Sequence, residues 1–106
     1  MKSENYPTRS ELIRRFTYDP AVGRLRYRFA VGRARTGNPV GHLHTGQLQA
    51  AFGGCRLQVA RLVWIWHRGA VPQGRFVKTI DGDPLNVAIE NLFLASHPTE
   101  KFEPLA

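Results

Sequence analysis

Residues 24–29 alternate strictly between arginine and a large apolar side chain. The arginines are Arg24, Arg26 and Arg28, and the apolar residues are Leu25, Tyr27 and Phe29. A period of two residues places alternate side chains on opposite faces of a β-strand. The segment therefore predicts a strand with one arginine face and one apolar face, and the apolar face needs a core to pack against.

Two other segments have the pattern of helices. Residues 11–16 predict a short helix that Thr8 or Ser10 can cap. Residues 60–68 predict a longer helix, which Gly69 ends. The longer helix is expected to lie at the centre of the fold, because it is the best amphipathic segment of the chain.

Strands and turns are expected in the remaining parts of the chain. Gly53-Gly54 predicts the turn of a hairpin between residues 47–52 and 56–59. Residues 31–47 contain Pro39 and several glycines, so they predict an irregular loop. Shorter strands are predicted at the positions 75–80 and 92–95, after and before turn residues.

These elements predict the α+β class: a small single domain with antiparallel strands, including a hairpin, and a central helix. Within a domain of residues 1–97, the first part (8–35) carries the short helix and the basic strand, and the second part (47–69) carries the hairpin and the long helix. The third part is 75–97, and residues 98–106 are expected to form a frayed tail. A length of 106 residues with 42% hydrophobic residues supports one folded unit of this size.

Composition also excludes several classes of protein. The longest apolar stretch, around Leu62–Trp66, is far shorter than the roughly 20 residues of a membrane span, so no membrane partner is expected. The N-terminal residues have no secretory signal pattern, and we expect a cytoplasmic protein. The single cysteine, Cys55, excludes a disulfide-stapled scaffold and a zinc site of several thiolates.

The formal net charge is +7, and its excess lies in the first third of the chain. Residues 1–35 hold nine basic and three acidic side chains, and eight of the nine are arginines. The planar arginine fork suits phosphate oxygens, so nucleic acid is the predicted partner, and DNA before RNA. A solvated basic face and an acidic protein surface are the alternatives.

Several motifs follow one another along residues 16–97. They are Phe16-Thr17-Tyr18-Asp19-Pro20-Ala21-Val22-Gly23-Arg24-Leu25, Gly37-Asn38-Pro39-Val40-Gly41, Arg61-Leu62-Val63-Trp64 with His67 and Gly69, Pro72-Gln73-Gly74, and Ile80-Asp81-Gly82-Asp83-Pro84-Leu85 with Ile89-Glu90-Asn91-Leu92. In this order they resemble the HNH homing-type endonucleases that are common in phage genomes. The resemblance implies a ββα-metal unit at residues 75–97.

The departures from the family pattern fall on its chemistry. Family members typically read Val-Asp-His-Ile-Asn-Gly-Asp where this chain has Lys78-Thr79 in place of the Asp-His pair. In the family, the aspartate holds a divalent metal and the histidine is the general base. A threonine hydroxyl does not accept a proton near pH 7. An ammonium at the position of Lys78 repels a divalent ion.

Two other positions of the family pattern have changed, and one structural position has been kept. Ala60 stands where the family has a histidine, and the last metal ligand, on a closing helix, falls at or near Glu100. Asn91, which in the family braces the loop that holds the base, is retained. The resemblance therefore implies a degenerate member without catalytic residues, metal or other cofactor. Trp64, Gly82 and Asn91 are expected to be structural.

By the same resemblance, the segment before the ββα unit lies on the duplex. The predicted nucleic-acid-binding residues are Arg24, Arg26, Arg28, Arg33, Arg35, Arg61 and Lys78. The leading hypothesis is an inactive, HNH-like DNA-binding protein. The second is a phage inhibitor that binds a host defence or DNA-processing complex. The third is a divergent nuclease in which Asp81, Asp83 and Glu100 form a new magnesium site.

Some remaining residues have simpler interpretations. His42 and His44 are expected to be exposed rather than metal ligands. One of Trp64 and Trp66 is expected in the core, and the other could form a contact surface. His67 is expected to end its helix by bonding a backbone carbonyl, and Cys55 is expected to be a spare thiol.

Overall fold

The computed structural model describes residues 6–30, 32–52 and 54–102. Its elements along the chain are α1 (Arg9–Arg15), β1 (Phe16–Asp19), β2 (Arg24–Tyr27), β3 (His42–His44), β4 (Gln47–Phe52), β5 (Cys55–Gln58), α2 (Val59–Arg68), β6 (Phe76–Thr79), η2 (Ile89–Asn91) and β7 (Leu92–Ala95). The predicted α+β class is confirmed.

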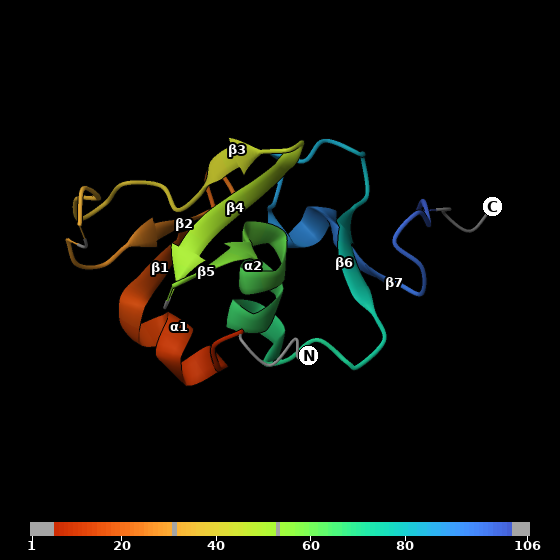
Figure 1. Cartoon of the computed structure of the whole chain (residues 1–106), viewed down its shortest axis with the longest axis horizontal. Coiled ribbons are helices and arrows are strands. Elements are labelled where there is room, and N and C mark those ends of the chain that lie inside the picture. The colour runs from red at the N-terminus through yellow and green to blue at the C-terminus, as the bar shows by residue number, and fades with distance from the viewer. Residues whose placement is uncertain (1–5, 31, 53, 103–106) are drawn as a thin grey trace.

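Every sheet is antiparallel and small. β1 pairs with β2, β3 to β5 form a sheet in the order β3-β4-β5, and β6 pairs with β7. Figure 1 shows α2 in the middle of the molecule, with α1 and β1 on one side and β6 and β7 on the other. The predicted central helix is confirmed, and so is the predicted hairpin, whose strands are β4 and β5.

The core is built around α2. Val59, Leu62 and Val63 have no exposed surface, and Ile65 is nearly buried as well. Leu12 from α1, Leu25 from β2 and Val77 from β6 belong to the same buried cluster. The helix therefore supplies apolar contacts to all three sheets and to α1.

The N-terminal helix has the predicted cap. The Thr8 hydroxyl accepts a hydrogen bond from the Glu11 backbone N–H, and the Glu11 carboxylate accepts one from the Thr8 backbone N–H at 2.9 Å. This reciprocal capping box selects Thr8 over Ser10 as the cap. The helix ends at Arg15, however, because Phe16 already pairs with Tyr27 in a strand. The prediction of helix at Phe16 was therefore wrong.

The prediction of an irregular loop over residues 31–47 was wrong at its end. His42–His44 form β3, which pairs with β4. Thr45 and Gly46 make the connecting turn with φ values of 50° and 81°. Two central residues with positive φ are typical of a tight hairpin turn, but Thr-Gly is a weaker sequence signal than Asn-Gly.

The C-terminal unit at residues 75–97 contains the two predicted strands, β6 and β7. The closing helix that the resemblance implies is not found in the described residues. Beyond β7, the described residues 96–102 contain bends and a turn and no helix. Residues 98–102 nevertheless contact the hairpin: the Lys78 ammonium donates to the Pro98 carbonyl, and the centre of the Phe102 ring lies 5.4 Å from that of Phe93. Of the predicted frayed tail, 98–106, the last four residues lie outside the described part of the chain. No helix in the described part of the chain is long and apolar enough to span a bilayer.

The close approach of Gly23 to Ala88 allows a test of this packing. Gly23 has φ 67°, and a Cβ there would lie 2.7 Å from the Cα of Ala88. Gly37 has φ 88°, but a Cβ at that position would meet nothing within 4 Å. We expect Gly23→Ala to lower the free energy of unfolding by about 1–3 kcal/mol more than Gly37→Ala. Urea denaturation of the two variants measures the difference, and equal losses would contradict the packing described here.

Candidate functional site

A cavity of about 270 Å³ lies between β6, the start of α2 and the β3–β4 turn. Ala60, Lys78 and Thr79 all line it. These are the three positions at which the resemblance places a histidine and the Asp-His pair. Although Ala60 is far from the other two in the sequence, the packing of α2 against β6 brings them to one cavity.

The side chains at these positions do not fit a divalent metal. Ala60 has no donor atom, Thr79 offers a neutral hydroxyl, and the Lys78 ammonium donates to the Pro98 carbonyl at 2.5 Å. Metal ions of this kind prefer carboxylate and imidazole ligands. Within the described ranges, no three His, Cys, Asp or Glu residues are grouped so that they could hold a metal. No catalytic step through a metal follows from these residues.

The carboxylate of Asp81 is committed to the loop between β6 and β7. Its oxygens accept hydrogen bonds from the side-chain amides of Asn91 and Asn86, each at 2.9 Å, and from the Asp83 backbone N–H. Asn91 also donates to the Asn86 carbonyl at 2.8 Å. These bonds, with Asn91 the largest contributor, lower the pKa of Asp81 below its usual 3.8. Asn91 therefore braces this loop through Asp81.

The other two carboxylates of the alternative magnesium site are used elsewhere. Asp83 accepts a hydrogen bond from the Leu85 N–H at 3.0 Å, as expected of a turn aspartate. Glu100 accepts one from the Ser96 N–H at 2.6 Å and lines a different hollow, beside Phe93 and Phe102. It follows a turn and does not lie on a closing helix. Gly82, next to Asp81 and Asp83 in the sequence, has φ 80° and lines the cavity.

The predicted arginine face of β2 makes contacts within the fold. Arg24 donates to the Val40 carbonyl, and Arg28 donates to the carbonyls of Ile13 and Phe16. Arg26 forms an ion pair with Asp19 at 2.9 Å and donates to the Gly37 carbonyl. The three guanidinium groups thus tie β2 to α1, β1 and the following loop, although the side chain of Arg28 is still exposed.

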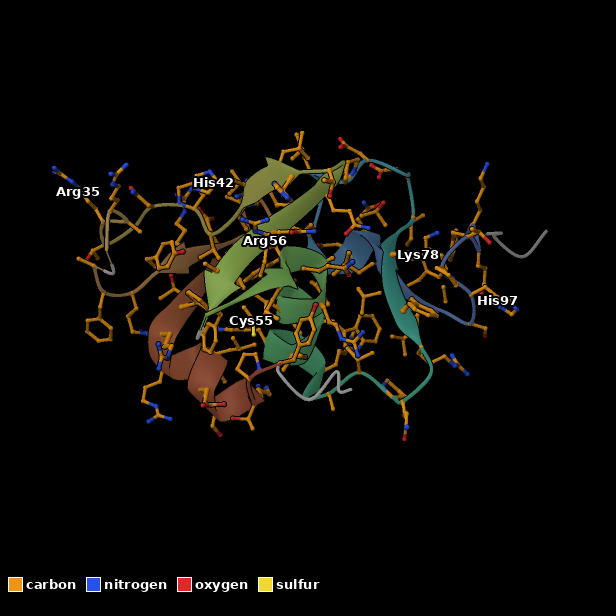
Figure 2. The ribbon with its side chains drawn as sticks, in the orientation of Figure 1. Arg35, His42, Cys55, Arg56, Lys78 and His97 are labelled. Carbon is orange, nitrogen blue, oxygen red and sulfur yellow. The ribbon has the colours of Figure 1, made fainter. Side chains whose placement is uncertain are left out.

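The remaining predicted binding residues lie far apart. Arg33 and Arg35 belong to the loop between β2 and β3. Figure 2 places Arg35 and Lys78 toward opposite ends of the long axis. Arg61 is half-buried on α2, with its guanidinium 4.8 Å from the centre of the Tyr6 ring. The predicted residues therefore do not form one continuous patch.

A polar surface that we did not predict covers the outer face of the β3–β5 sheet. The registers of the strands place its members on one face: His42, His44, Gln47, Gln49, Arg56 and Gln58. Arg56 lies 2.8 Å from a ring nitrogen of His44, and the Gln58 amide donates to Gln47. Gln47 and Gln58 also line the cavity, so the outer face and the cavity are continuous. The sequence signal for this face was the alternation of polar and apolar residues in the segments before and after Gly53-Gly54.

The residues with simpler interpretations mostly behave as expected. His42 and His44 are exposed, and Cys55 is a free, half-buried thiol on β5. The His67 ring nitrogen Nδ1 lies 2.9 Å from the Val63 carbonyl one turn earlier in α2.

The two tryptophans are both half-buried, so neither is a fully buried core residue. The ring of Trp66 packs at 5.8 Å from the ring of Tyr18. The Trp64 N–H donates to the Ala70 carbonyl at 3.2 Å, just beyond the end of α2. Trp64 therefore helps to fix the chain where it leaves the helix.

The elements around the cavity also carry a family match. Residues 58–99 match a family model described as HNH endonuclease. The matched segment contains α2, β6, β7 and the braced loop, so it includes Ala60, Lys78 and Thr79. It supports an HNH-type family for this part of the chain. No curated protein and no solved structure matched.

The brace around Asp81 gives a pH-dependent prediction. Because the folded-state pKa of Asp81 is lowered, its bonds stabilise the protein above pH 3.8 and are lost as the pH falls through the folded-state value. We expect Asn91→Ala to destabilise the protein at pH 7 and to have a smaller effect at low pH, where the wild type has lost the same interaction. Urea denaturation across this range measures the difference, and a constant effect would contradict the role of Asp81.

The arginines give a second prediction. Arg28→Ala removes the donor to the carbonyls of Ile13 and Phe16, and because these bonds are partly exposed to water, the free energy of unfolding should fall by about 0.5–1.5 kcal/mol. Arg33→Ala, on the loop between β2 and β3, should change it by less than about 0.5 kcal/mol. Thermal or urea unfolding of the two variants measures this contrast. Equal stabilities would mean that the Arg28 contacts do not hold the fold.

Proposed function

We propose that this chain is a degenerate HNH-type protein that binds nucleic acid, with DNA as the first candidate, and does not hydrolyse it. The observation that carries the proposal is the cavity around which Ala60, Lys78 and Thr79 meet. The family match covers all three positions. The scaffold is therefore proposed to be retained, while a general base and metal ligands are missing from it.

The chemistry of hydrolysis supports the inactive assignment. Attack on a phosphodiester requires a group that accepts a proton from water, and metal ions normally stabilise the developing charge. Thr79 does not accept a proton from water at neutral pH. Lys78 can pair with a phosphate oxygen but cannot hold a second cation close by. The residues that line this cavity therefore give no route to cleavage of a nucleic acid bound to the protein.

The charge of the chain supports a polyanionic partner. At +7 it attracts phosphates over a distance, and this attraction weakens with salt. Because the guanidinium groups of Arg24, Arg26 and Arg28 are engaged within the fold, the proposed contacts rest first on Arg33 and Arg35. Lys78 is a secondary contact, because its ammonium already donates to the Pro98 carbonyl. In Figure 2, His42 and Arg56 of the polar face lie between Arg35 and Lys78, so this face can extend the interface.

A phage origin fits the resemblance to the HNH family. A phage protein could have a second function, which is the alternative proposal. In this alternative, the chain is an inhibitor of a host defence or DNA-processing complex and acts in the bacterial cytoplasm. The observation that favours a protein partner is a strand edge beside Lys78: β6 pairs with β7 alone among the described strands.

Reversion of the three changed positions tests the inactive assignment. The wild type should neither bind Mn²⁺ in calorimetry nor nick supercoiled plasmid with Mg²⁺ or Mn²⁺. The triple variant Ala60→His, Lys78→Asp and Thr79→His returns ligand side chains to one cavity and should bind Mn²⁺. Nicking by the wild type that disappears on Asp83→Ala or Glu100→Ala would instead support the divergent nuclease.

Salt dependence tests the binding surface. We expect the double variant Arg33→Ala/Arg35→Ala to weaken binding of a fluorescent DNA duplex and to reduce the slope of log K against log salt by about two. Arg75→Ala/Lys101→Ala removes the same charge from other exposed positions and should change the slope less. Fluorescence anisotropy at several salt concentrations measures both variants. Absence of binding by the wild type at low salt would contradict the proposal.

A further inference from the structure

Strand β6 is paired on one edge only. Its partner is β7, and no other described strand pairs with it. All four of its residues, 76–79, line the cavity. Successive side chains of a strand point to opposite faces, so a cavity that touches every residue in turn reaches both faces of the strand, and no residue of β7 lines it. The cavity therefore lies against the unpaired edge of β6.

The backbone of this edge offers both donors and acceptors. The Ile80 N–H donates to the Asn91 carbonyl at 2.7 Å, which makes Ile80 and Asn91 a hydrogen-bonded pair. Because such pairs alternate in antiparallel strands, Val77 and Thr79 direct their N–H and C=O groups away from β7. Among the described residues, no backbone hydrogen bond outside the strand ladders and no side-chain hydrogen bond reaches these four groups. Val77 is only 7% exposed, so two of the groups lie on a largely buried residue.

The charge beside this edge has one sign. Lys78 is the charged residue among those lining the cavity. The nearest carboxylates in the sequence, on Asp81 and Asp83, bond to amides of their own loop. The facing wall carries the neutral amides of Gln47 and Gln58, which bond to each other. A ligand that lies along β6 therefore meets no lining carboxylate and one cation, the Lys78 ammonium, which also donates to the Pro98 carbonyl.

We propose that the edge of β6 binds an extended segment of a partner protein, which adds as a strand and places an Asp or Glu side chain on Lys78. Strand addition uses main-chain hydrogen bonds for affinity and side-chain pockets for specificity. A phosphodiester presents acceptors only, and would leave the carbonyls of Val77 and Thr79 unpaired. A peptide backbone satisfies both the N–H and the C=O groups, so the edge favours a peptide.

The first step of the test is selection of peptides from a random octamer library on the full-length protein. We expect the selected peptides to combine β-branched residues with Asp or Glu. With the best peptide, amide hydrogen exchange followed by NMR should slow at Val77 and Thr79, because these N–H groups become bonded. Methylation of alternate amide nitrogens of the peptide should weaken binding about tenfold through the loss of main-chain bonds.

Matched variants test the charge contact. Lys78→Glu should weaken the acidic peptide about tenfold or more, whereas Lys101→Glu, an equal charge change outside the cavity, should not. Selected peptides with no acidic preference, or with no protection at Val77 and Thr79, would overturn the proposal. So would protection of these amides by a DNA dinucleotide, or by self-association of the protein without peptide. DNA binding is measured separately by anisotropy. If peptide binding at β6 fails, the proposal of DNA binding can still be tested, and the reverse also holds.

Discussion

The packing of α2 is the constraint on which the rest of the structure depends. A hairpin of two strands is marginally stable by itself in water, and the described residues form two such hairpins and one sheet of three short strands. Each becomes stable by placing apolar residues against the same helix. Val59, Leu62 and Val63 are fully buried because they are covered from several directions. Loss of these contacts would remove the support of every sheet at once.

The same packing determines where chemistry could occur. The start of α2 lies against β6, and this contact joins Ala60 to Lys78 and Thr79 around one cavity. The loop that follows β6 is fixed by Asp81 and Asn91, whose bonds use the carboxylate within the loop. The molecule therefore has the framework for a compact site, but its side chains offer an ammonium, a hydroxyl and a methyl group. These groups suit binding of an anion better than hydrolysis.

Much of this arrangement could be predicted from local patterns. The capping box at Thr8, the Gly-Gly hairpin and the helix ended by Gly69 follow from rules that act over a few residues. The strands β1 and β3 were missed because their pairing partners decide them, and neither has a strong local signal. The contacts of Arg24 and Arg28 were also missed. An alternating arginine pattern fixes the face of a strand, but it does not reveal which carbonyls lie within reach of that face.

The positions of the HNH resemblance meet at one cavity without side chains that could hold a metal. Paramagnetic broadening measures this directly, because bound Mn²⁺ broadens the NMR signals of nearby amides. Titration of Mn²⁺ into the wild-type protein should leave the amides of Ala60, Lys78 and Thr79 no broader than those of other residues with similar exposure. Broadening centred on these three amides at low Mn²⁺ would instead mean that the cavity is a metal site.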